Sequence, residues 1–122
     1  MSKHILIVDD SQSIRSVTRS YLESQPRFAV CGEAVDGLDA LDKARDLHPD
    51  LIILDLEMPR LNGFQTARAL RTRNVNTPII LFTIYADAVR PQDATAAGLD
   101  AVVSKSDLSS LQQEIERLLV LN

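Results

Sequence analysis

Three carboxylates, one hydroxyl and one ammonium group stand at or just after the ends of short apolar runs in this sequence. Asp9 and Asp10 follow the first run, Asp55 follows the third, Thr83 ends the fourth, and Lys105 comes just after the fifth. Carboxylates held close together bind hard divalent cations, and Mg²⁺ in particular when phosphate is also present. A hydroxyl and an ammonium beside such a cation can orient and neutralise a phosphoryl group. The residue types therefore favour metal-assisted phosphoryl transfer, with Asp55 as the natural nucleophile.

These five residues can meet only if the apolar runs are strands of one sheet. The runs are rich in Ile, Val and Leu and do not alternate with polar residues, which is typical of strands buried on both faces. We predict strands at residues 5–8, 28–31, 51–54, 79–82 and 101–103. Asp9, Asp10, Asp55, Thr83 and Lys105 then lie at the carboxyl ends of four of them.

Helical patterns separate the predicted strands. Asp36 and Asp107 stand where N-caps belong, and Pro91 and Gly98 bound the fourth helix, at residues 91–97. The stripes expected to face the core in three other helices are Ile14, Val17, Tyr21 and Leu22; Leu38, Leu41, Ala44 and Leu47; and Leu108, Leu111, Ile115 and Leu118. The remaining helix, the third, is marked by Phe64, Ala67, Leu70 and Arg71.

Five βα repeats predict an α/β fold, a doubly wound parallel sheet of five strands with helices on both faces. The flavodoxin-like order 2-1-3-4-5 is the known arrangement that we expect for such a chain. We expect one domain over residues 1–122, with no second domain after the fifth helix. In this order strands 1 and 3 are neighbours, which places Asp9, Asp10 and Asp55 together. Carboxylates about 4 Å apart repel by about 4 kcal/mol at an effective dielectric of 20, so either some are protonated or a cation lies among them.

The composition limits the other classes of function. The net charge of −4 and the lack of a basic run oppose nucleic-acid binding by this domain. No apolar run is long enough for a signal peptide or a membrane span, so we expect a cytoplasmic protein with no membrane partner. Cys31 is the only cysteine, and we interpret it as a small core residue.

Four segments together resemble the receiver domains of two-component response regulators, which include the chemotaxis regulators. They are residues 5–11 (ILIVDDS), 50–63 (DLIILDLEMPRLNG), 78–83 (PIILFT) and 97–105 (AGLDAVVSK). Each segment alone is a weak signal, but their order and their positions at strand ends make the combination specific. The resemblance covers essentially the whole chain.

The resemblance implies a role for each residue that matches the family pattern. Asp55 is expected to be the phospho-acceptor, Asp10 a direct ligand of Mg²⁺, and Asp9 an acidic neighbour that acts largely through water. The backbone carbonyl of Glu57 is the expected third protein contact of the metal.

Two further residues match the family pattern on the other side of the site. Thr83 corresponds to the switch hydroxyl that follows the phosphoryl group, and Lys105 to the lysine that pairs with it.

The resemblance also implies partners. The phosphodonor is expected to be a sensor histidine kinase, a phosphotransfer protein or a small phosphodonor. The output domain or partner protein is expected at the face formed by helix 4, strand 5 and helix 5. Pairing of two copies stays open. The chain is expected to assist its own phosphorylation and dephosphorylation rather than to act as an enzyme on a separate substrate.

Three positions depart from the usual family pattern. Val102 stands where many receivers have Tyr or Phe, so the aromatic half of the switch is missing. Ile84 stands where a small residue is common and could narrow the entrance to Asp55. Ser106 replaces a frequent proline, so no cis X-Pro bond is expected there.

Two alternative functions remain open from the residues. A phosphate-independent docking module is kept open by Val102 and Ile84. A phosphatase that works through an aspartyl-phosphate usually carries Asp-x-Asp after its first strand, whereas this chain has Asp9-Asp10 and no cap domain.

Overall fold

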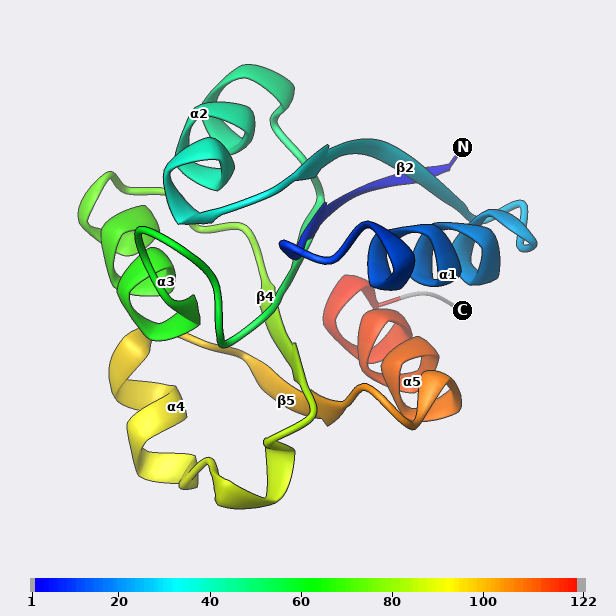
Figure 1. Cartoon of the computed structure of the whole chain (residues 1–122). Helices are drawn as coiled ribbons and strands as arrows, with labels where there is room; N and C mark the ends of the chain where they lie inside the picture. Colours follow the sequence, from blue (N-terminus) through cyan, green and yellow to red (C-terminus); the bar gives the residue numbers. More distant parts are fainter. Residues whose placement is uncertain (1, 121–122) are drawn as a thin grey trace.

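The computed structural model of the chain describes residues 2–120, in which strands and helices alternate along the sequence (Figure 1). The elements are β1 (Lys3–Val8), α1 (Gln12–Glu23), β2 (Phe28–Ala34), α2 (Gly37–Leu47), β3 (Leu51–Leu54), α3 (Gly63–Thr72), β4 (Ile79–Thr83), α4 (Pro91–Ala97), β5 (Ala101–Ser104) and α5 (Leu108–Leu119). A short 3₁₀ turn, η1 (Ala86–Ala88), lies between β4 and α4. None of the helices in the described residues is long and apolar enough to cross a bilayer.

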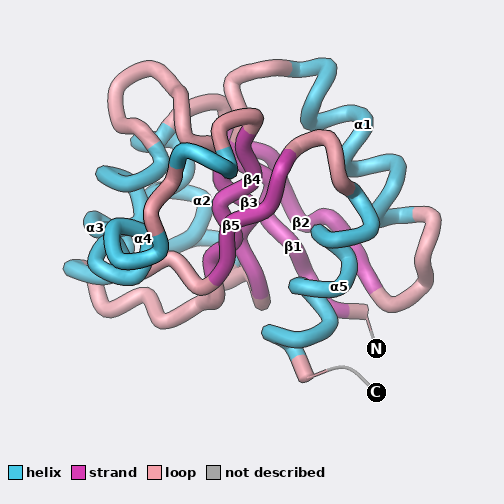
Figure 2. Tube along the Cα trace, turned by 90° about the horizontal axis from the view of Figure 1, so that it is seen from below, coloured by secondary structure: helices cyan, strands magenta, loops and turns pink. Residues whose placement is uncertain are grey.

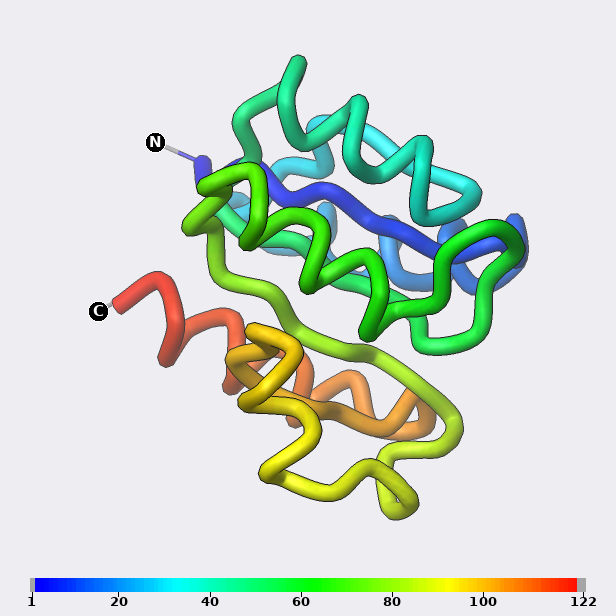
Figure 3. The backbone as a smooth tube through the Cα atoms, turned by 90° about the vertical axis from the view of Figure 1, so that its left-hand side faces the viewer, coloured from blue at the N-terminus to red at the C-terminus, as the bar shows by residue number. Residues whose placement is uncertain are grey.

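The five strands form one parallel sheet in the order β2-β1-β3-β4-β5. This confirms the predicted fold class and strand order. Figure 2 shows the sheet between two layers of helices, with α1 and α5 on one face and α2, α3 and α4 on the other. Along the second face α2 packs on α3 and α3 packs on α4 (Figure 3).

The apolar runs fill two cores, one on each face of the sheet. Side chains alternate between the faces along a strand. Leu6, Ile52 and Leu81 therefore belong to the core under α2, α3 and α4. Ile7, Ile53 and Ile80 belong to the core under α1 and α5. Burial on both faces explains why these runs carry no polar alternation.

The structure extends several predicted strands, most of all β2. The sequence predicts a strand over residues 28–31, but the ladder with β1 continues through Gly32 and Glu33 to Ala34. Because β2 is an edge strand with a half-exposed face, its later residues need not be apolar, and the apolar run stops before the strand does.

Three residues predicted on buried helical stripes are exposed. Val17 is 57% exposed, and Leu38 and Leu47 are also exposed. In α1 the neighbouring Thr18 is buried instead. Its hydroxyl tolerates burial because it donates to the Ile14 carbonyl at 2.8 Å and so needs no water. In α2 the buried stripe is made of smaller residues that let the helix approach the sheet closely: Gly37, Ala40, Leu41 and Ala44.

The other helix predictions agree with the structure. Asp36 and Asp107 cap α2 and α5, each by accepting from a backbone N–H three residues later. The helix α4 runs over the predicted residues and ends at Gly98, whose φ of 88° favours glycine. Arg71, one of the residues that mark α3 in the sequence, is half-buried and donates to the Gly98 carbonyl at 2.7 Å.

Candidate functional site

The carboxyl ends of β1, β3, β4 and β5 bring all five chemically interesting side chains to one edge of the sheet. Backbone hydrogen bonds fix each position: Asp9 N donates to the Ala34 carbonyl at 3.0 Å, and Asp55 N to the Val8 carbonyl at 2.9 Å. On the other side, Lys105 N donates to the Thr83 carbonyl at 3.0 Å. The site therefore stands on the rigid sheet rather than on loops alone.

The three carboxylates form a compact acidic cluster. Asp9, Asp10 and Asp55 each offer an oxygen within 4.8 Å of the others. Asp9 and Asp55 are only 3% and 7% exposed, whereas Asp10 is exposed. Carboxylate oxygens gathered at such separations are a suitable donor set for a hard divalent cation.

The main-chain carbonyl of Glu57 is a candidate fourth oxygen donor. Glu57 is exposed and lies in the turn after β3, two residues beyond Asp55. Within residues 2–120 no donor forms a hydrogen bond to this carbonyl. Its lone pairs are therefore free to bind a cation or water, which fits the role that the family resemblance implies.

Lys105 is the counter-charge of the cluster. Its Nζ lies 2.7 Å from Asp9 Oδ2 and 3.1 Å from Asp55 Oδ1. Burial by itself would lower the pKa of the ammonium, but the hydrogen bond to Asp9 and the charges of Asp55 and Asp9 outweigh it and raise the pKa of Lys105. The ammonium therefore stays charged at neutral pH.

The surroundings of Asp55 raise the pKa of its carboxyl. Burial is the largest cause that raises the pKa of its carboxyl, the charge of Asp9 adds to it, and Lys105 offsets both only in part. Asp55 Oδ1 accepts from Leu56 N at 2.8 Å and from Lys105. Oδ2 accepts no hydrogen bond within the described residues, and none of their buried side-chain oxygens is unpaired, so this atom reaches solvent.

Thr83 lies fully buried at the end of β4. Its hydroxyl oxygen accepts from Tyr85 N at 3.0 Å, which leaves the hydroxyl hydrogen free to donate elsewhere. The next residue, Ile84, is 69% exposed, and its predicted effect on the entrance to Asp55 stays a prediction. Val102, at the usual aromatic position, is half-buried and packs against the core under α4.

The turn after β3 requires glycine at position 63. Gly63 N donates to the Leu56 carbonyl at 2.7 Å, which closes the turn. A Cβ on Gly63 would lie 2.5 Å from the Asp55 carbonyl oxygen. Asn62 and Gln65 form a reciprocal capping box that starts α3 directly afterwards. These contacts fix the backbone on the carboxyl side of Asp55.

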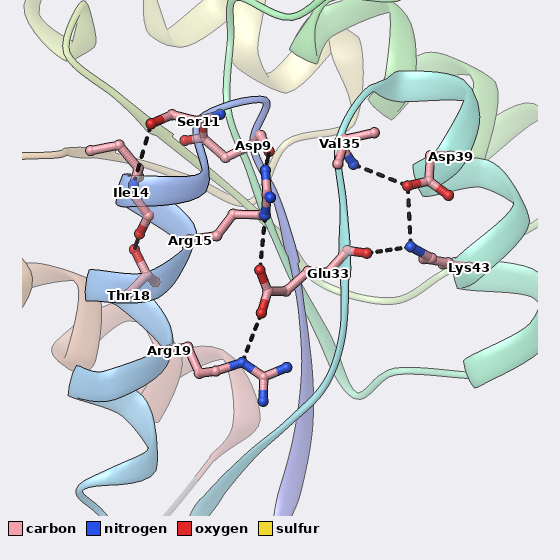
Figure 4. A network of polar contacts seen from close by, with 10 residues as sticks. All are labelled: Asp9, Ser11, Ile14, Arg15, Thr18, Arg19, Glu33, Val35, Asp39 and Lys43. Carbon is pink, nitrogen blue, oxygen red and sulfur yellow. Dashed lines mark hydrogen bonds and ion pairs between the residues drawn. The ribbon is translucent and has the colours of Figure 1, made fainter.

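One residue that touches the site was missed by the sequence reasoning. Arg15 of α1 donates through Nη1 to the Asp9 carbonyl at 2.7 Å and through Nε to Glu33 at 2.8 Å (Figure 4). Arg19 holds the other oxygen of Glu33 at 2.8 Å. Burial alone would raise the pKa of Glu33, but the hydrogen bonds from Arg15 and Arg19 outweigh it and lower that pKa. The available signal was a basic residue one helical turn after Ser11, the N-cap that follows Asp9-Asp10.

Comparison with solved structures supports the geometry. The response regulator domain of Thermotoga maritima CheB superposes with a TM-score of 0.89 at 28% identity, covering all of this chain and 99% of that one. A LuxR-family two-component response regulator from Aurantimonas sp. SI85-9A1 gives a TM-score of 0.88 at 32% identity, covering 98% of this chain and 86% of that one.

Curated relatives are longer proteins. A protein-glutamate methylesterase/protein-glutamine glutaminase from Nocardioides sp. is 37% identical over 117 residues, which are 93% of this chain and 32% of that protein. One of the same name from Symbiobacterium thermophilum is 39% identical over 116 residues, again 93% of this chain and 32% of the relative. The chain thus spans about a third of the length of these relatives.

The family model described as the response regulator receiver domain matches residues 5–116. This match, the relatives and the similar structures favour neither the phosphatase nor the phosphate-independent docking module. They confirm the family that the four sequence segments indicate: the chain belongs to the response regulator receiver domains of two-component signalling.

Proposed function

We propose that residues 1–122 form one receiver domain that accepts a phosphoryl group on Asp55. The observation that carries the proposal is the set of groups that surround the Asp55 carboxylate. It lies within 4.8 Å of two other carboxylates, pairs with Lys105 at 3.1 Å, and keeps one oxygen free of hydrogen bonds and open to solvent. An oxygen in this position can attack phosphorus while the surrounding charges stay fixed.

The acidic cluster is the proposed site of Mg²⁺. Asp9, Asp10, Asp55 and the carbonyl of Glu57 supply the hard oxygen donors that this ion prefers. The bound ion would neutralise negative charge on the phosphoryl oxygens.

Three side chains have separate roles in the transfer of the phosphoryl group. Asp55 Oδ2 forms the new bond to phosphorus, and the bond between phosphorus and the leaving group of the donor breaks, so the leaving group departs with its electron pair. Lys105, already 3.1 Å from Asp55, pairs with one phosphoryl oxygen. Thr83 donates its free hydroxyl hydrogen to another, and this contact couples the phosphoryl group to the segment after β4. Phosphoryl transfer needs little beyond such positioning and neutralisation.

The proposed partners follow from the family. The donor is a sensor histidine kinase, a phosphotransfer protein or a small phosphodonor, and the proposed output face is the surface of α4, β5 and α5. The domain acts as a phosphorylatable signalling module in the cytoplasm rather than as an enzyme on a separate substrate. The longer curated relatives support a partner or output domain, because a receiver makes up only about a third of each.

Intact mass spectrometry after incubation with acetyl phosphate and Mg²⁺ tests this proposal. We expect one added phosphoryl group on the wild type. We expect none in EDTA, because the metal is then removed, and none on Asp55→Asn, because the nucleophile is lost. A folded wild type that gains no phosphoryl group, and that also fails to bind beryllofluoride with Mg²⁺, would contradict the proposal.

A further inference from the structure

A second layer of contacts holds the segment that carries two of the three carboxylates. Beyond β1, the Asp9 carbonyl no longer accepts from a neighbouring strand and instead accepts from Arg15 Nη1 at 2.7 Å. The next peptide is held separately, because Ser11 N donates to the side-chain oxygen Asp9 Oδ1 at 2.9 Å. Within residues 2–120, the hydrogen bond from Arg15 is the one formed by the peptide that joins Asp9 to Asp10.

This orientation matters most for Asp10. Its side chain takes part in no hydrogen bond or ion pair within residues 2–120, and it is exposed. Yet its carboxylate reaches within 4.8 Å of those of Asp9 and Asp55. With no side-chain partner of its own, Asp10 depends on the backbone before it to face the cluster.

The guanidinium of Arg15 is itself fixed in place. The Arg15 side chain is only 12% exposed, and its Nε makes a 2.8 Å ion pair with Glu33 of the edge strand β2. Glu33 is held in turn by Arg19, and its backbone carbonyl accepts from Lys43 of α2 (Figure 4). A planar guanidinium anchored at one nitrogen presents its other donors in a defined direction.

We propose that Arg15, anchored by Glu33, is a positioning residue of the divalent-cation site: it fixes the Asp9–Asp10 peptide so that Asp10 faces Asp9 and Asp55. This inference rests on the proposed function, because it takes the acidic cluster as the metal site. It connects the edge strand β2 and helix α1 to the affinity for the cation.

A positioning role and a purely electrostatic role of Arg15 predict opposite changes in cation affinity when Arg15 is removed. Arg15 is a fixed positive charge next to a site for a divalent cation, so its removal should tighten cation binding if charge were its only contribution. Loss of a residue that orients a metal ligand typically weakens metal affinity by about 10–100-fold. The sign of the change therefore separates a positioning role from a purely electrostatic one.

Arg19 is the matched control within the same network. Like Arg15, it lies on α1, carries one positive charge and binds Glu33 at 2.8 Å. Unlike Arg15, it makes no hydrogen bond to Asp9. Arg19→Gln therefore removes the same charge and one Glu33 ion pair while it leaves the Asp9 carbonyl bound.

The experiment titrates Mn²⁺ into each protein and follows the free ion by electron paramagnetic resonance, since Mn²⁺ shares the oxygen preference of Mg²⁺. Asp10→Asn defines binding outside the site, and urea unfolding checks that each variant is folded. We expect Arg15→Gln to weaken Mn²⁺ binding by about tenfold. Arg15→Lys should weaken it too, because an ammonium keeps the charge but lacks the two-pronged geometry. Arg19→Gln should stay within about twofold of the wild type, because salt screens its half-exposed charge.

Three results would overturn the inference. Folded Arg15 variants that bind Mn²⁺ as tightly as the wild type, or more tightly, would leave the proposed metal site intact and remove only the role of Arg15. Equal weakening in Arg19→Gln would assign the effect to general loosening of α1 against β2. A wild type that binds no more Mn²⁺ than Asp10→Asn would overturn the metal site and this inference together.

Discussion

The substitution Asp55→Asn should stabilise the metal-free fold although it removes the proposed phosphorylation site. Asn keeps the size of the side chain and the oxygen that accepts from Leu56 N at 2.8 Å. It removes a buried negative charge from beside Asp9 and Asp10. Lys105 keeps a partner, because it also lies 2.7 Å from Asp9.

The expected gain follows from the distances. The three carboxylates lie within 4.8 Å of one another, and at that limit each repulsion that Asp55 feels from Asp9 and Asp10 is about 3.5 kcal/mol at an effective dielectric of 20. The attraction to Lys105 at 3.1 Å is about 5 kcal/mol on the same scale. The balance is about 1.5 kcal/mol against the charged carboxylate, and its burial adds to this cost. We therefore expect Asp55→Asn to raise the free energy of unfolding by about 1–2 kcal/mol at neutral pH in EDTA.

Urea unfolding with and without Mg²⁺ measures this effect. Mg²⁺ stabilises a folded state that binds it, by about 2.7 kcal/mol at a hundred times the dissociation constant. The wild type should therefore gain more from Mg²⁺ than Asp55→Asn does, and the gap between them should close or reverse. Because the folded-state pKa of Asp55 is raised, the wild type should also recover stability relative to the variant as the pH falls through that pKa.

Asp42→Asn is a control for loss of one negative charge. Asp42 is exposed on α2, where its ion pair with Arg45 at 3.7 Å contributes little. An Asp55→Asn protein that is less stable than the wild type in EDTA would refute the reasoning. So would a difference between the two proteins that Mg²⁺ leaves unchanged.

Two further predictions concern the surroundings of the site. Gly63→Ala should destabilise the fold by about 1–3 kcal/mol in urea unfolding, because the new Cβ meets the Asp55 backbone oxygen at 2.5 Å. The control is Gly32→Ala, whose Cβ would lie 2.6 Å from the tip of the exposed Leu47 side chain and at an ordinary 3.7 Å from Leu6. Because the Leu47 tip can move aside, this variant should change stability by no more than about 0.5 kcal/mol, and equal losses in both variants would argue against the clash. The folded-state pKa of Glu33 is lowered, so its ionised carboxylate stabilises the fold at pH values above the unfolded-state pKa. This stabilisation is lost as the pH falls through the folded-state pKa. The difference in unfolding free energy between the wild type and Glu33→Gln should therefore close in acid. A gap that stays constant from neutral to acid pH would contradict the ion pairs drawn for Glu33.

The parts of the fold that were predictable are those with a local signal. Strand β3 has the predicted bounds because Leu51–Leu54 is buried on both faces and ends at a charged residue. Helix α4 has its predicted bounds because Pro91 and Gly98 limit it chemically. The exposure of Val17 had no such signal, since the choice between Val17 and Thr18 depends on how α1 is rotated against the sheet.

The residues of the candidate site also divide into those that have a signal in the sequence and those that have none. Asp9, Asp10, Asp55, Thr83 and Lys105 could be brought together from sequence because parallel strands end at a common edge. Arg15 could not, because its contacts depend on an edge strand that continues past its apolar run to Glu33. A long side chain that reaches from a helix to an edge strand and to the residue after another strand leaves no periodic pattern in the sequence.

The most direct test of the account is to locate the phosphoryl group after transfer. The protein is incubated with acetyl phosphate and Mg²⁺, treated with sodium borohydride, which reduces an acyl phosphate to an alcohol, and then digested for peptide mass spectrometry. We expect homoserine at position 55 alone, and none when Mg²⁺ is withheld. Homoserine at Asp9 or Asp10 with Asp55 unmodified would contradict the assignment of Asp55 as the residue that accepts the phosphoryl group.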